Sequence, residues 1–296
     1  MIYEKNIVIL DLHINLSKVI IKQYPHSMRC ILFCIFLMIS LYSHSQVSKE
    51  RKVYIIAHRC NDLEKPGKAL LQGVNGIEAD FWHEDGKWHV SHDGIVKQDL
   101  DEWLKTMAQL SKQYKEQFAL LIFDIKKKES ISDLVKKVNT YLPADLNKVY
   151  SVSKIVNAEI FKEVASTLSA LEMLSIDQED QSLAVDSFFK SINFSRCLYG
   201  NGIDAMLLNV ENYQKALKRA SEIRDSSGAF LKTYIWTIER KRTIKTFFTD
   251  CNVDGVIVNL NTAFKKPVKR ALKICRKYNM LLAKRADLNS ELKTRN

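Results

Sequence analysis

Glycine and proline are scarce in this chain, with nine glycines and four prolines among 296 residues. So few flexible or chain-breaking residues argue against long disordered linkers, and the sequence holds no convincing short repeat and no low-complexity tract. Apolar residues make up 46% of the chain and charged residues 27%, which is ordinary for a globular protein. The length suits one large domain or two small ones.

Cysteine is also sparse, and its spacing excludes one class of site. Four cysteines follow residue 45, namely Cys60, Cys197, Cys251 and Cys275. No pair of them has CxxC spacing, so a structural zinc site is not expected. In a secreted protein they could form disulfides, and four cysteines allow three complete pairings among which the sequence does not choose.

Nucleic-acid-binding motifs are missing although the chain is basic. The formal net charge is +11, yet the sequence contains neither zinc-finger spacing nor an RNA-binding signature. A basic surface without such motifs suits anionic membranes or anionic ligands rather than nucleic acid. We interpret the basic run between residues 265 and 277 mainly as the solvent-exposed face of a C-terminal helix. Attraction of this run to a membrane is a minor alternative.

Long apolar runs are missing as well. Residues 31–42 form an apolar run of twelve, which is too short to span a bilayer. Arg29 precedes this run and the polar stretch SHSQ follows it, which is the layout of a secretory signal peptide. We therefore predict a signal peptide over residues 28–45; the alternatives are an uncleaved anchor or a buried core segment.

The signal peptide divides the chain into three parts. Residues 1–27 would be an N-terminal extension or a gene-model artefact, because Met28 stands at the start of the signal sequence. Residues 46–296 would be the mature domain, which we expect to be secreted, monomeric and without a transmembrane anchor. Removal of residues 1–45 deletes four basic and two acidic groups, so the formal net charge falls from +11 to +9.

Short β-rich runs alternate with amphipathic stretches along the mature chain. The predicted strands cover residues 53–57, 76–81, 118–126, 149–153, 171–177, 205–209, 230–238 and 253–259. The stretches between them have helical spacing, and Asp85-Gly86 predicts a two-residue hairpin turn after the second strand. Eight strand–helix units in about 250 residues predict a single (β/α)8 barrel.

A doubly wound open sheet is the competing fold. That fold commonly binds dinucleotides through a glycine-rich loop after the first strand, where this chain has AHRCND instead. The barrel is therefore favoured.

Polar residues stand at the carboxyl ends of the predicted strands, where a (β/α)8 barrel carries its chemistry. They include Glu78 and Asp80 on the second strand, and Asp124 with Lys126 on the third. Alternate residues of a strand point to the same face, so Glu78 and Asp80 project together. Three carboxylates at one mouth repel one another unless a cation joins them, and hard oxygen ligands suit Mg²⁺, with Ca²⁺ second. Lys126 could neutralise a phosphate oxygen beside that ion.

Histidine is missing after residue 92, which narrows the choice of acid–base residues. Of seven histidines, three fall before residue 46, and the other four are His58, His83, His89 and His92. His58 ends the first strand and His92 opens the HDG loop, so these two could protonate and deprotonate a phosphodiester from opposite sides. Alternatively, one of them could attack phosphorus directly. Taken alone, a histidine at the end of a strand is more often structural than catalytic. Glu78 and Asp80 could also form salt bridges with lysine or arginine and hold no metal.

The motifs AHRCND, GIEADF, VSHDG, LLIFDIKKK and YIWTIERKRTIKTFFTDCNVDGVIVN together resemble the glycerophosphodiester phosphodiesterase-like superfamily. Within it, residues 53–262 look most like the sphingomyelinase D or phospholipase D toxins. The resemblance implies a phospholipase C-like phosphodiesterase barrel, with His58 and His92 as the catalytic pair. It implies Mg²⁺ on Glu78, Asp80 and Asp124, phosphate contact by Lys126, a choline-type head-group pocket at Tyr234 and Trp236, and a site lined by Asp177 and Asn259.

Such enzymes expel the head-group alcohol by attack of a substrate hydroxyl and leave a cyclic phosphate. This chain departs from the toxins in having Arg59 after His58, as glycerophosphodiesterases do, and in lacking cysteine between Cys60 and Cys197. Three functions are therefore considered. The first is a secreted, Mg²⁺-dependent phospholipase D-type enzyme acting on sphingomyelin or lysophospholipids at a membrane surface. The second is a glycerophosphodiester phosphodiesterase that uses water, and the third is a non-catalytic lipid- or choline-binding barrel.

Overall fold

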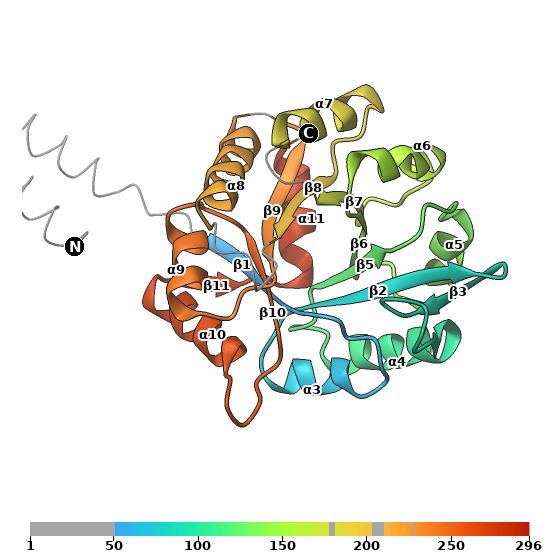
Figure 1. The fold of residues 1–296 in the computed structure, drawn as a ribbon, viewed down its shortest axis with the longest axis horizontal. Helices are drawn as coiled ribbons and strands as arrows, with labels where there is room; N and C mark the ends of the chain where they lie inside the picture. Colours follow the sequence, from blue (N-terminus) through green and yellow to red (C-terminus); the bar gives the residue numbers. More distant parts are fainter. Residues whose placement is uncertain (1–50, 178–180, 203–209, 227, 296) are drawn as a thin grey trace, which may run out of the picture. The chain divides into compact units, whose positions relative to one another are not determined.

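A computed structural model describes residues 51–177, 181–202, 210–226 and 228–295. Eight parallel strands close into a barrel, because β1 pairs with both β10 and β2 (Figure 1). The barrel strands, in chain order, are β1 (Arg51–Ala57), β2 (Gly76–Glu84), β5 (Leu120–Ile125), β6 (Asn147–Val152), β7 (Glu172–Asp177), β8 (Cys197–Gly202), β9 (Phe230–Trp236) and β10 (Gly255–Val258). The predicted (β/α)8 fold is confirmed.

Three further strands extend the sheet beyond the barrel. They are β3 (Lys87–Val90), β4 (Gln98–Asp99) and β11 (Met280–Leu282). β3 pairs antiparallel with β2 through the predicted Asp85-Gly86 turn, where both residues have positive φ (51° and 72°). Such φ values are those of the hairpin turn that Asp-Gly favours, so the turn prediction is confirmed.

Helices surround the barrel, as in Figure 1. They are α3 (Lys65–Leu71), α4 (Leu100–Gln113), α5 (Ser132–Tyr141), η1 (Ile155–Ile160), α6 (Phe161–Val164), α7 (Ser182–Ser191), α8 (Val210–Asp225), α9 (Lys241–Thr249), α10 (Pro267–Lys277) and α11 (Arg285–Arg295). The larger apolar cluster packs strands against these helices, and a smaller one, with Ile56, Ile122 and Leu198, fills the barrel interior. Burial on both faces explains why the strands read as continuous apolar runs.

One predicted strand, at 205–209, lies outside the described residues. The sixth strand of the barrel is β8, which begins eight residues before that prediction and was not predicted from the sequence. β8 has the sequence CLYGNG, whose glycines weaken a strand pattern, although all six residues are buried.

The helix α11 closes the end of the barrel at which the strands begin. Its Leu288 packs with Tyr54, Ile56 and Leu120 of the interior cluster. Arg285, 7% exposed, donates to the carbonyl oxygens of Phe118 (3.0 Å) and Ser111 (2.6 Å). The opposite end, where the strands finish, is left for a site.

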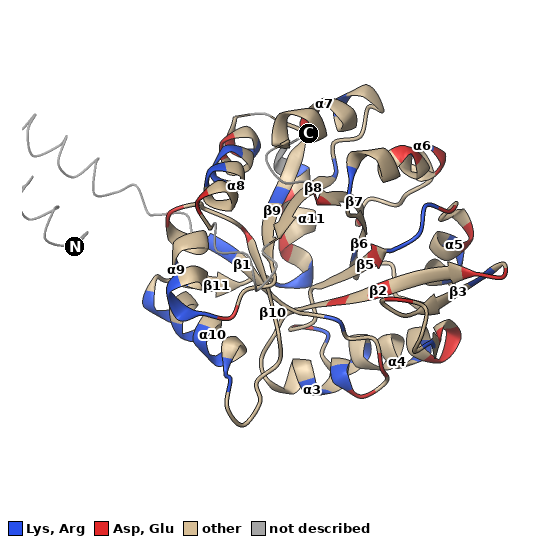
Figure 2. Ribbon diagram, viewed as in Figure 1, with Lys and Arg blue, Asp and Glu red and all other residues tan. Residues whose placement is uncertain are grey.

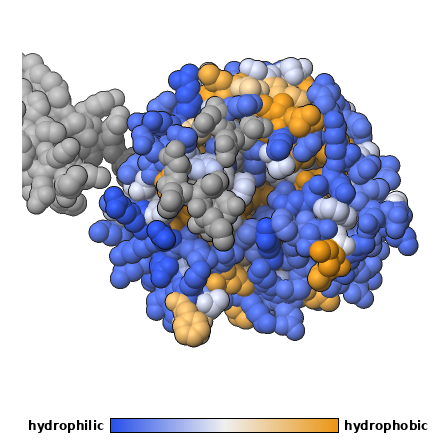
Figure 3. All heavy atoms as spheres, viewed as in Figure 1, coloured by the Kyte–Doolittle hydropathy of each residue, from blue (hydrophilic) through white to orange (hydrophobic). Residues whose placement is uncertain are grey.

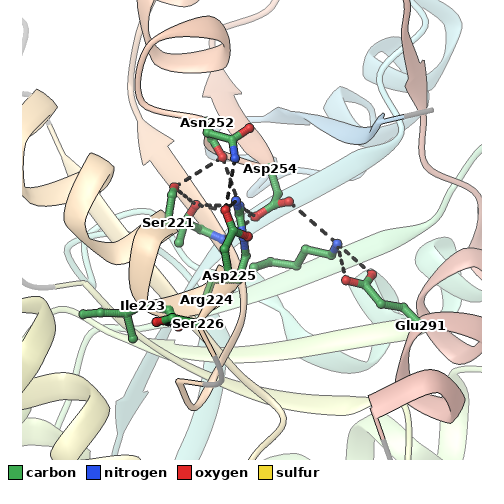
Figure 4. Close-up of polar contacts among 10 residues, drawn as sticks. Ser221, Ile223, Arg224, Asp225, Ser226, Asn252, Asp254 and Glu291 are labelled. Atoms are coloured by element: carbon green, nitrogen blue, oxygen red, sulfur yellow. Dashed lines mark hydrogen bonds and ion pairs between the residues drawn. The ribbon is translucent and has the colours of Figure 1, made fainter. Parts of the chain in front are cut away.

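A buried ionic network also lies at the end of the barrel that α11 closes (Figure 4). Arg224 of α8 pairs with Asp254, and the Asn252 carbonyl accepts from Arg224 at 2.9 Å. Lys232 of β9 lies 2.7 Å from Glu291 of α11. Nearby carboxylates raise the pKa of Arg224 despite the opposing effect of burial. These pairs join α8, β9 and α11, so we assign them to stability rather than to chemistry.

The four cysteines that follow residue 45 are buried, and no disulfide joins any two of them. Cys60 Sγ donates to the Ala57 carbonyl and Cys251 Sγ to that of Gln214. None of the three possible pairings is therefore formed. The predicted extension and signal peptide lie outside the described residues, and no described helix has the length and apolar character needed to cross a membrane.

Candidate active site

The acidic residues of β2 face the inside of the barrel. Ile77, Ala79 and Phe81 belong to the cluster that packs against the helices, so strand alternation turns Glu78 and Asp80 inward. Their side chains are 3% and 1% exposed. The GIEADF motif thus carries an apolar face outward and two carboxylates inward.

The third carboxylate comes from the neighbouring strand. Asp124 follows the inward-facing Ile122 of β5, and it stands directly beside Asp80 in the parallel register. One oxygen from each of Glu78, Asp80 and Asp124 lies within 4.8 Å of the others. The structure therefore brings the three predicted ligands together.

A cavity of about 210 Å³ opens at this end of the barrel. Its lining comes from seven barrel strands or the residues that follow them, as expected for the catalytic end of this fold. The lining residues are His58, Arg59, Glu78, His92, Ile122, Asp124, Lys126, Ser151, Ser153, Asp177, Tyr234, Trp236 and Ile257.

The carboxylates carry more negative charge than the neighbouring Lys126 offsets. Lys126 Nζ lies 2.9 Å from Asp80 Oδ1 and 2.5 Å from Asp124 Oδ2, and these carboxylates raise the pKa of Lys126 against the effect of burial. Burial opposes ionisation of Asp80, but Lys126 and a hydrogen bond from Asn61 outweigh it and lower its pKa. Burial and the other two carboxylates raise the pKa of Glu78 well above its usual range.

This charge imbalance fits a bound divalent cation. Glu78 Oε2 accepts a hydrogen bond from the Arg59 backbone N–H at 2.6 Å, which fixes the carboxylate without neutralising it. Three carboxylates with oxygens this close are a ligand set for Mg²⁺ or Ca²⁺, both of which prefer oxygen. The residues present therefore fit the predicted metal, and the choice of ion belongs to the proposal below.

A hydrogen bond to Asn259 fixes the orientation of the His58 ring. Its Nδ1 lies 3.0 Å from Oδ1 of Asn259, which can only accept, so Nδ1 carries a proton and Nε2 keeps its lone pair. Asn259 Nδ2 in turn donates to Glu239 Oε1 at 2.8 Å, which fixes the amide orientation. Burial lowers the pKa of His58 to about 4. The structure thus presents His58 as a neutral imidazole.

His92 lies between a carboxylate and a guanidinium. Its Nδ1 is 3.4 Å from Asp80 Oδ1, and its Nε2 is 2.7 Å from a terminal nitrogen of Arg59. Arg59 has φ 50°, a left-handed conformation, and its backbone N–H donates to Glu78. Arg59 therefore contacts the acidic group through its backbone and His92 through its side chain.

Tyr234 and Asp177 form the floor of the cavity. The Tyr234 hydroxyl donates to Asp177 Oδ1 at 2.5 Å, and Ser151 and Ser175 lie 3.2 and 2.9 Å from the same hydroxyl. Desolvation and, second, the charge of Asp124 raise the pKa of Asp177 to about 7. Tyr234 is only 2% exposed, and its hydroxyl is engaged by these three contacts.

Two glycines of β8 make room for the aromatic residues. A Cβ on Gly200 would overlap Asp177 and Tyr234, and a Cβ on Gly202 would overlap the indole of Trp236. Both glycines are therefore required by close approach. Because β8 was not predicted from the sequence, the role of these glycines was not predicted either.

The structure gathers the predicted site residues at one end of the barrel, with Asn259 behind His58 and Asp80 beneath the cavity surface. Sequence analysis missed Asn61, whose side chain bonds both the carboxylate and the backbone N–H of Asp80 (2.7 and 2.9 Å). It also missed Ser151 and Ser175, although both occupy inward positions on strands that end in polar residues.

A family model described as Sphingomyelinase D/Phospholipase D matches residues 48–287. The chain is 24% identical over 246 residues to the dermonecrotic toxin LarSicTox-betaID1 of Loxosceles arizonica, covering 71% of this chain and 84% of the toxin. It is also 24% identical over 254 residues to a sphingomyelinase D of Aspergillus flavus, covering 78% of this chain and 86% of that enzyme.

The barrel is similar to that of a solved Oleispira antarctica phosphodiesterase, described in complex with the product sn-glycerol-3-phosphate. The TM-score is 0.55 at 14% sequence identity, and the match covers 77% of this chain and 98% of that one. At this identity the likeness concerns the fold.

Proposed function

The chain belongs to the sphingomyelinase D/phospholipase D family of phosphoric diester-cleaving enzymes, and we propose that it is a Mg²⁺-dependent phospholipase D-type enzyme. Its substrates would be sphingomyelin or lysophospholipids, from which it releases the head-group alcohol. The observation that carries this proposal is the convergence of two histidines and three carboxylates on one cavity. A binding protein of the same fold would have no need of that set, so we place the non-catalytic alternative last.

His58 would act as the base. Its Nε2 lone pair is available because Nδ1 bonds Asn259, and a pKa of about 4 keeps the imidazole neutral at ordinary pH. In the step we propose, a hydroxyl of the substrate gives its proton to His58 Nε2 and its oxygen forms a new bond to phosphorus. The attacking group is already tethered to the phosphate, so attack requires little loss of translational freedom.

His92 would act as the acid. The bond between phosphorus and the head-group oxygen breaks, and His92 gives a proton to that oxygen, which leaves a cyclic phosphate and a free alcohol. His92 Nε2 can carry this proton only when the Arg59 guanidinium has moved from it. The substrate phosphate offers Arg59 an anionic partner, so substrate binding would favour that movement.

Glu78, Asp80 and Asp124 would hold the metal, and a small set of carboxylates completed by a substrate phosphate favours Mg²⁺ over Ca²⁺. The bound ion would neutralise charge on the phosphoryl oxygens. Lys126 would contribute a second positive charge to the same group. Trp236 and Tyr234 would offer aromatic faces to a quaternary ammonium head group, and Asp177 beneath them would add a negative charge.

A glycerophosphodiester phosphodiesterase that admits water is the second candidate. The observation that favours it is Arg59, which lies at the cavity beside His92. Both candidates use the same histidines and ligands. They differ in whether the nucleophile is a hydroxyl of the substrate or water.

Phosphorus NMR separates these functions. The purified protein would be incubated with sphingomyelin, lysophosphatidylcholine and glycerophosphocholine, with Mg²⁺ or with EDTA. A cyclic phosphate that forms only with Mg²⁺ supports the phospholipase D-type reaction, and glycerol 3-phosphate supports the second candidate. Absence of turnover with all three substrates would contradict both.

Secretion is a further part of the proposal. We propose that residues 28–45 are removed as a signal peptide and that the barrel meets its substrate outside the cell as a monomer at a membrane surface. N-terminal sequencing of the protein from culture medium, with its mass in solution, tests this. A first residue upstream of Met28 in that protein would contradict the signal-peptide assignment.

A further inference from the structure

Exposed apolar residues gather at the end of the barrel that carries the cavity. Among the described residues, eight large hydrophobic side chains are exposed, and six of them lie in segments that follow the carboxyl end of a strand. These six are Leu63, Ile95, Val96, Val156, Leu183 and Phe264. The other two, Leu71 and Leu281, lie near the end that α11 closes. If exposed apolar side chains were spread evenly, similar numbers would lie at the two ends of the barrel.

Three of these residues are almost fully in solvent and follow His92 or Asn259 closely in the chain. Ile95 and Val96, 81% and 82% exposed, follow His92 in the loop between β3 and β4. Phe264, 95% exposed, lies in the loop between β10 and α10, five residues after Asn259. Side chains of this size are seldom left in water without a partner or a membrane to cover them.

The loops that carry these residues have defined local structure. The Ile95 backbone N–H donates to Asp93 Oδ1 at 2.9 Å, and Gly94 packs against the Trp82 indole. In the second loop, Thr262 N–H donates to the Lys265 carbonyl at 2.7 Å, which forms a turn with Phe264 inside it. The apolar side chains are therefore held outward by the loops.

Cations stand at the N-termini of α9 and α10, where helix dipoles disfavour them. Within the described residues, the first turns of α9 and α10 hold no acidic residue. α9 begins with Lys241 and Arg242, and Lys266 immediately precedes α10. Positive charge at a helix N-terminus is unfavourable for the helix. In Figure 2, Lys and Arg positions are frequent along α9 and α10.

The basic and apolar groups belong to one surface. Lys265 Nζ lies 3.2 Å from Glu239 Oε2, and Arg270 donates to the Glu239 carbonyl at 3.0 Å. These contacts join the loop of Phe264 to the segment that precedes α9. An anionic surface on this side would offset the unfavourable charges at both helix N-termini.

The pattern fits a lipid surface better than a protein partner. In Figure 3 the apolar areas at the right and at the lower left lie apart from each other on a mainly hydrophilic face, while a larger apolar area lies at the top. Protein interfaces usually present a contiguous apolar patch, whereas interfacial membrane binding combines separate apolar side chains with surrounding lysines and arginines.

We propose that this end of the barrel docks on membranes that contain anionic lipid, through a docking rim formed by Ile95, Val96, Phe264, Lys241, Arg242 and Lys266. The three apolar side chains enter the head-group region, and the three cations lie at the level of the lipid phosphates. The docked protein presents its cavity to the bilayer. This inference rests on the proposed function, because a lipid substrate gives the cavity a reason to face the membrane.

Tryptophan quenching tests the insertion of the rim. Val96→Trp and Phe264→Trp variants would be mixed with vesicles of phosphatidylcholine and phosphatidylserine whose acyl chains carry bromine. Leu71→Trp is the matched control, since Leu71 is 76% exposed at the other end of the barrel. The readout is quenching beyond that of the unmodified protein, so the apolar run at residues 31–42, present in every variant, does not disturb the comparison.

We expect added quenching for Val96→Trp and Phe264→Trp and none for Leu71→Trp. Equal quenching in all three variants, or quenching of Leu71→Trp alone, would overturn the proposed orientation. Failure of the unmodified protein to bind these vesicles would overturn the docking itself.

Charge reversal tests the basic part of the rim. A Lys241→Glu, Arg242→Glu, Lys266→Glu triple variant should bind the mixed vesicles at least about tenfold more weakly, since each cation near such a surface contributes to binding. The control is Lys112→Glu, Lys115→Glu, Lys284→Glu, which changes the net charge equally at the other end of the barrel. Equal loss in both variants would mean that net charge, not the rim, attracts the protein.

Both tests are run with EDTA, so they do not depend on turnover. Docking without turnover of any lipid, once Mg²⁺ is restored, would contradict the proposed function and leave the docking intact. Turnover of vesicle lipid with no contribution from the rim would contradict the docking alone.

Discussion

Nδ1 of His58 lies 3.0 Å from Oδ1 of Asn259, although 201 residues separate the two in the chain. They meet because β1 and β10 are parallel neighbours with Ala57 beside Val258, so the next residue of each strand stands at the same level. The closure of the barrel thus fixes which nitrogen of His58 carries the proton.

Replacing Asn259 should impair chemistry more than binding. Asn259→Ala removes the acceptor for Nδ1, so His58 can adopt the wrong tautomer, and we expect kcat to fall by roughly tenfold to a hundredfold, within the contribution typical of general acid–base groups. KM should change little. Asn261→Ala is the control, because Asn261 lies two residues later and bonds the α10 backbone instead. Equal effects of the two substitutions on kcat would exclude a specific role for the His58 contact.

Stability should fall in mild acid because of His58. Burial lowers its pKa to about 4 in the folded protein, against 6.5 in the unfolded chain, so between these values the unfolded state binds more protons. The free energy of unfolding should therefore decrease as the pH falls from 6.5 toward 4, by up to about 2 to 3 kcal/mol from this residue. Urea titrations of the protein and of His58→Asn at pH 7 and pH 4.5 measure the difference. A pH dependence unchanged by the substitution would refute this contribution.

Gly202 should not tolerate a side chain. A Cβ at this position would overlap the Trp236 indole, so Gly202→Ala should displace Trp236 and lower both the melting temperature and the turnover of choline-containing substrates. Gly67→Ala is the opposite case, because a Cβ there would lie 3.7 Å from Leu110, within α3. It should leave turnover unchanged and stabilise the fold by up to about 1 kcal/mol through helix propensity. Thermal unfolding and kinetics of both variants provide the comparison, and an unaffected Gly202→Ala would be inconsistent with the close contact.

The buried pair of Arg224 and Asp254 should be important for stability alone. Arg224 is 7% exposed and Asp254 is 6% exposed, so Arg224→Met leaves a buried carboxylate with less compensation and should cost about 3 to 5 kcal/mol. Lys215→Met removes an exposed ion pair with Glu211 on the same helix and should cost less than about 1 kcal/mol. Urea unfolding measures both. Similar values for the two variants would contradict the assignment of the network to stability.

The barrel and most of its site could be predicted because they follow from strand alternation. Ile56, Ile122 and Ile257 face inward, and two residues later on the same strands come His58, Asp124 and Asn259. An apolar run that ends in a polar residue at such a position is visible in the sequence. Seven of the eight barrel strands were recognised in this way.

The remainder depends on contacts that a sequence does not record. β8 was missed because two of its inward positions are Gly200 and Gly202, whose places are filled by side chains from β7 and β9. The hydrogen bond of Asn61 to Asp80 depends on how the loop after β1 folds back over β2. Arg59 was recognised as a polar residue at a strand end, but its contact with His92 depends on a left-handed backbone conformation.

The central claim is that Glu78, Asp80 and Asp124 hold a divalent cation that the reaction requires. The most direct test compares Glu78→Gln with Glu84→Gln, since both residues belong to β2 but Glu84 is exposed and pairs with Lys97. Mg²⁺ binding by calorimetry and Mg²⁺-dependent release of the head group would be measured for each variant, with circular dichroism to show that the barrel is folded. We predict that Glu78→Gln loses Mg²⁺ binding and at least about a hundredfold in turnover, as expected when a ligand to a catalytic metal is removed, while Glu84→Gln retains both. A folded Glu78→Gln protein with unchanged Mg²⁺ binding and turnover would contradict the account.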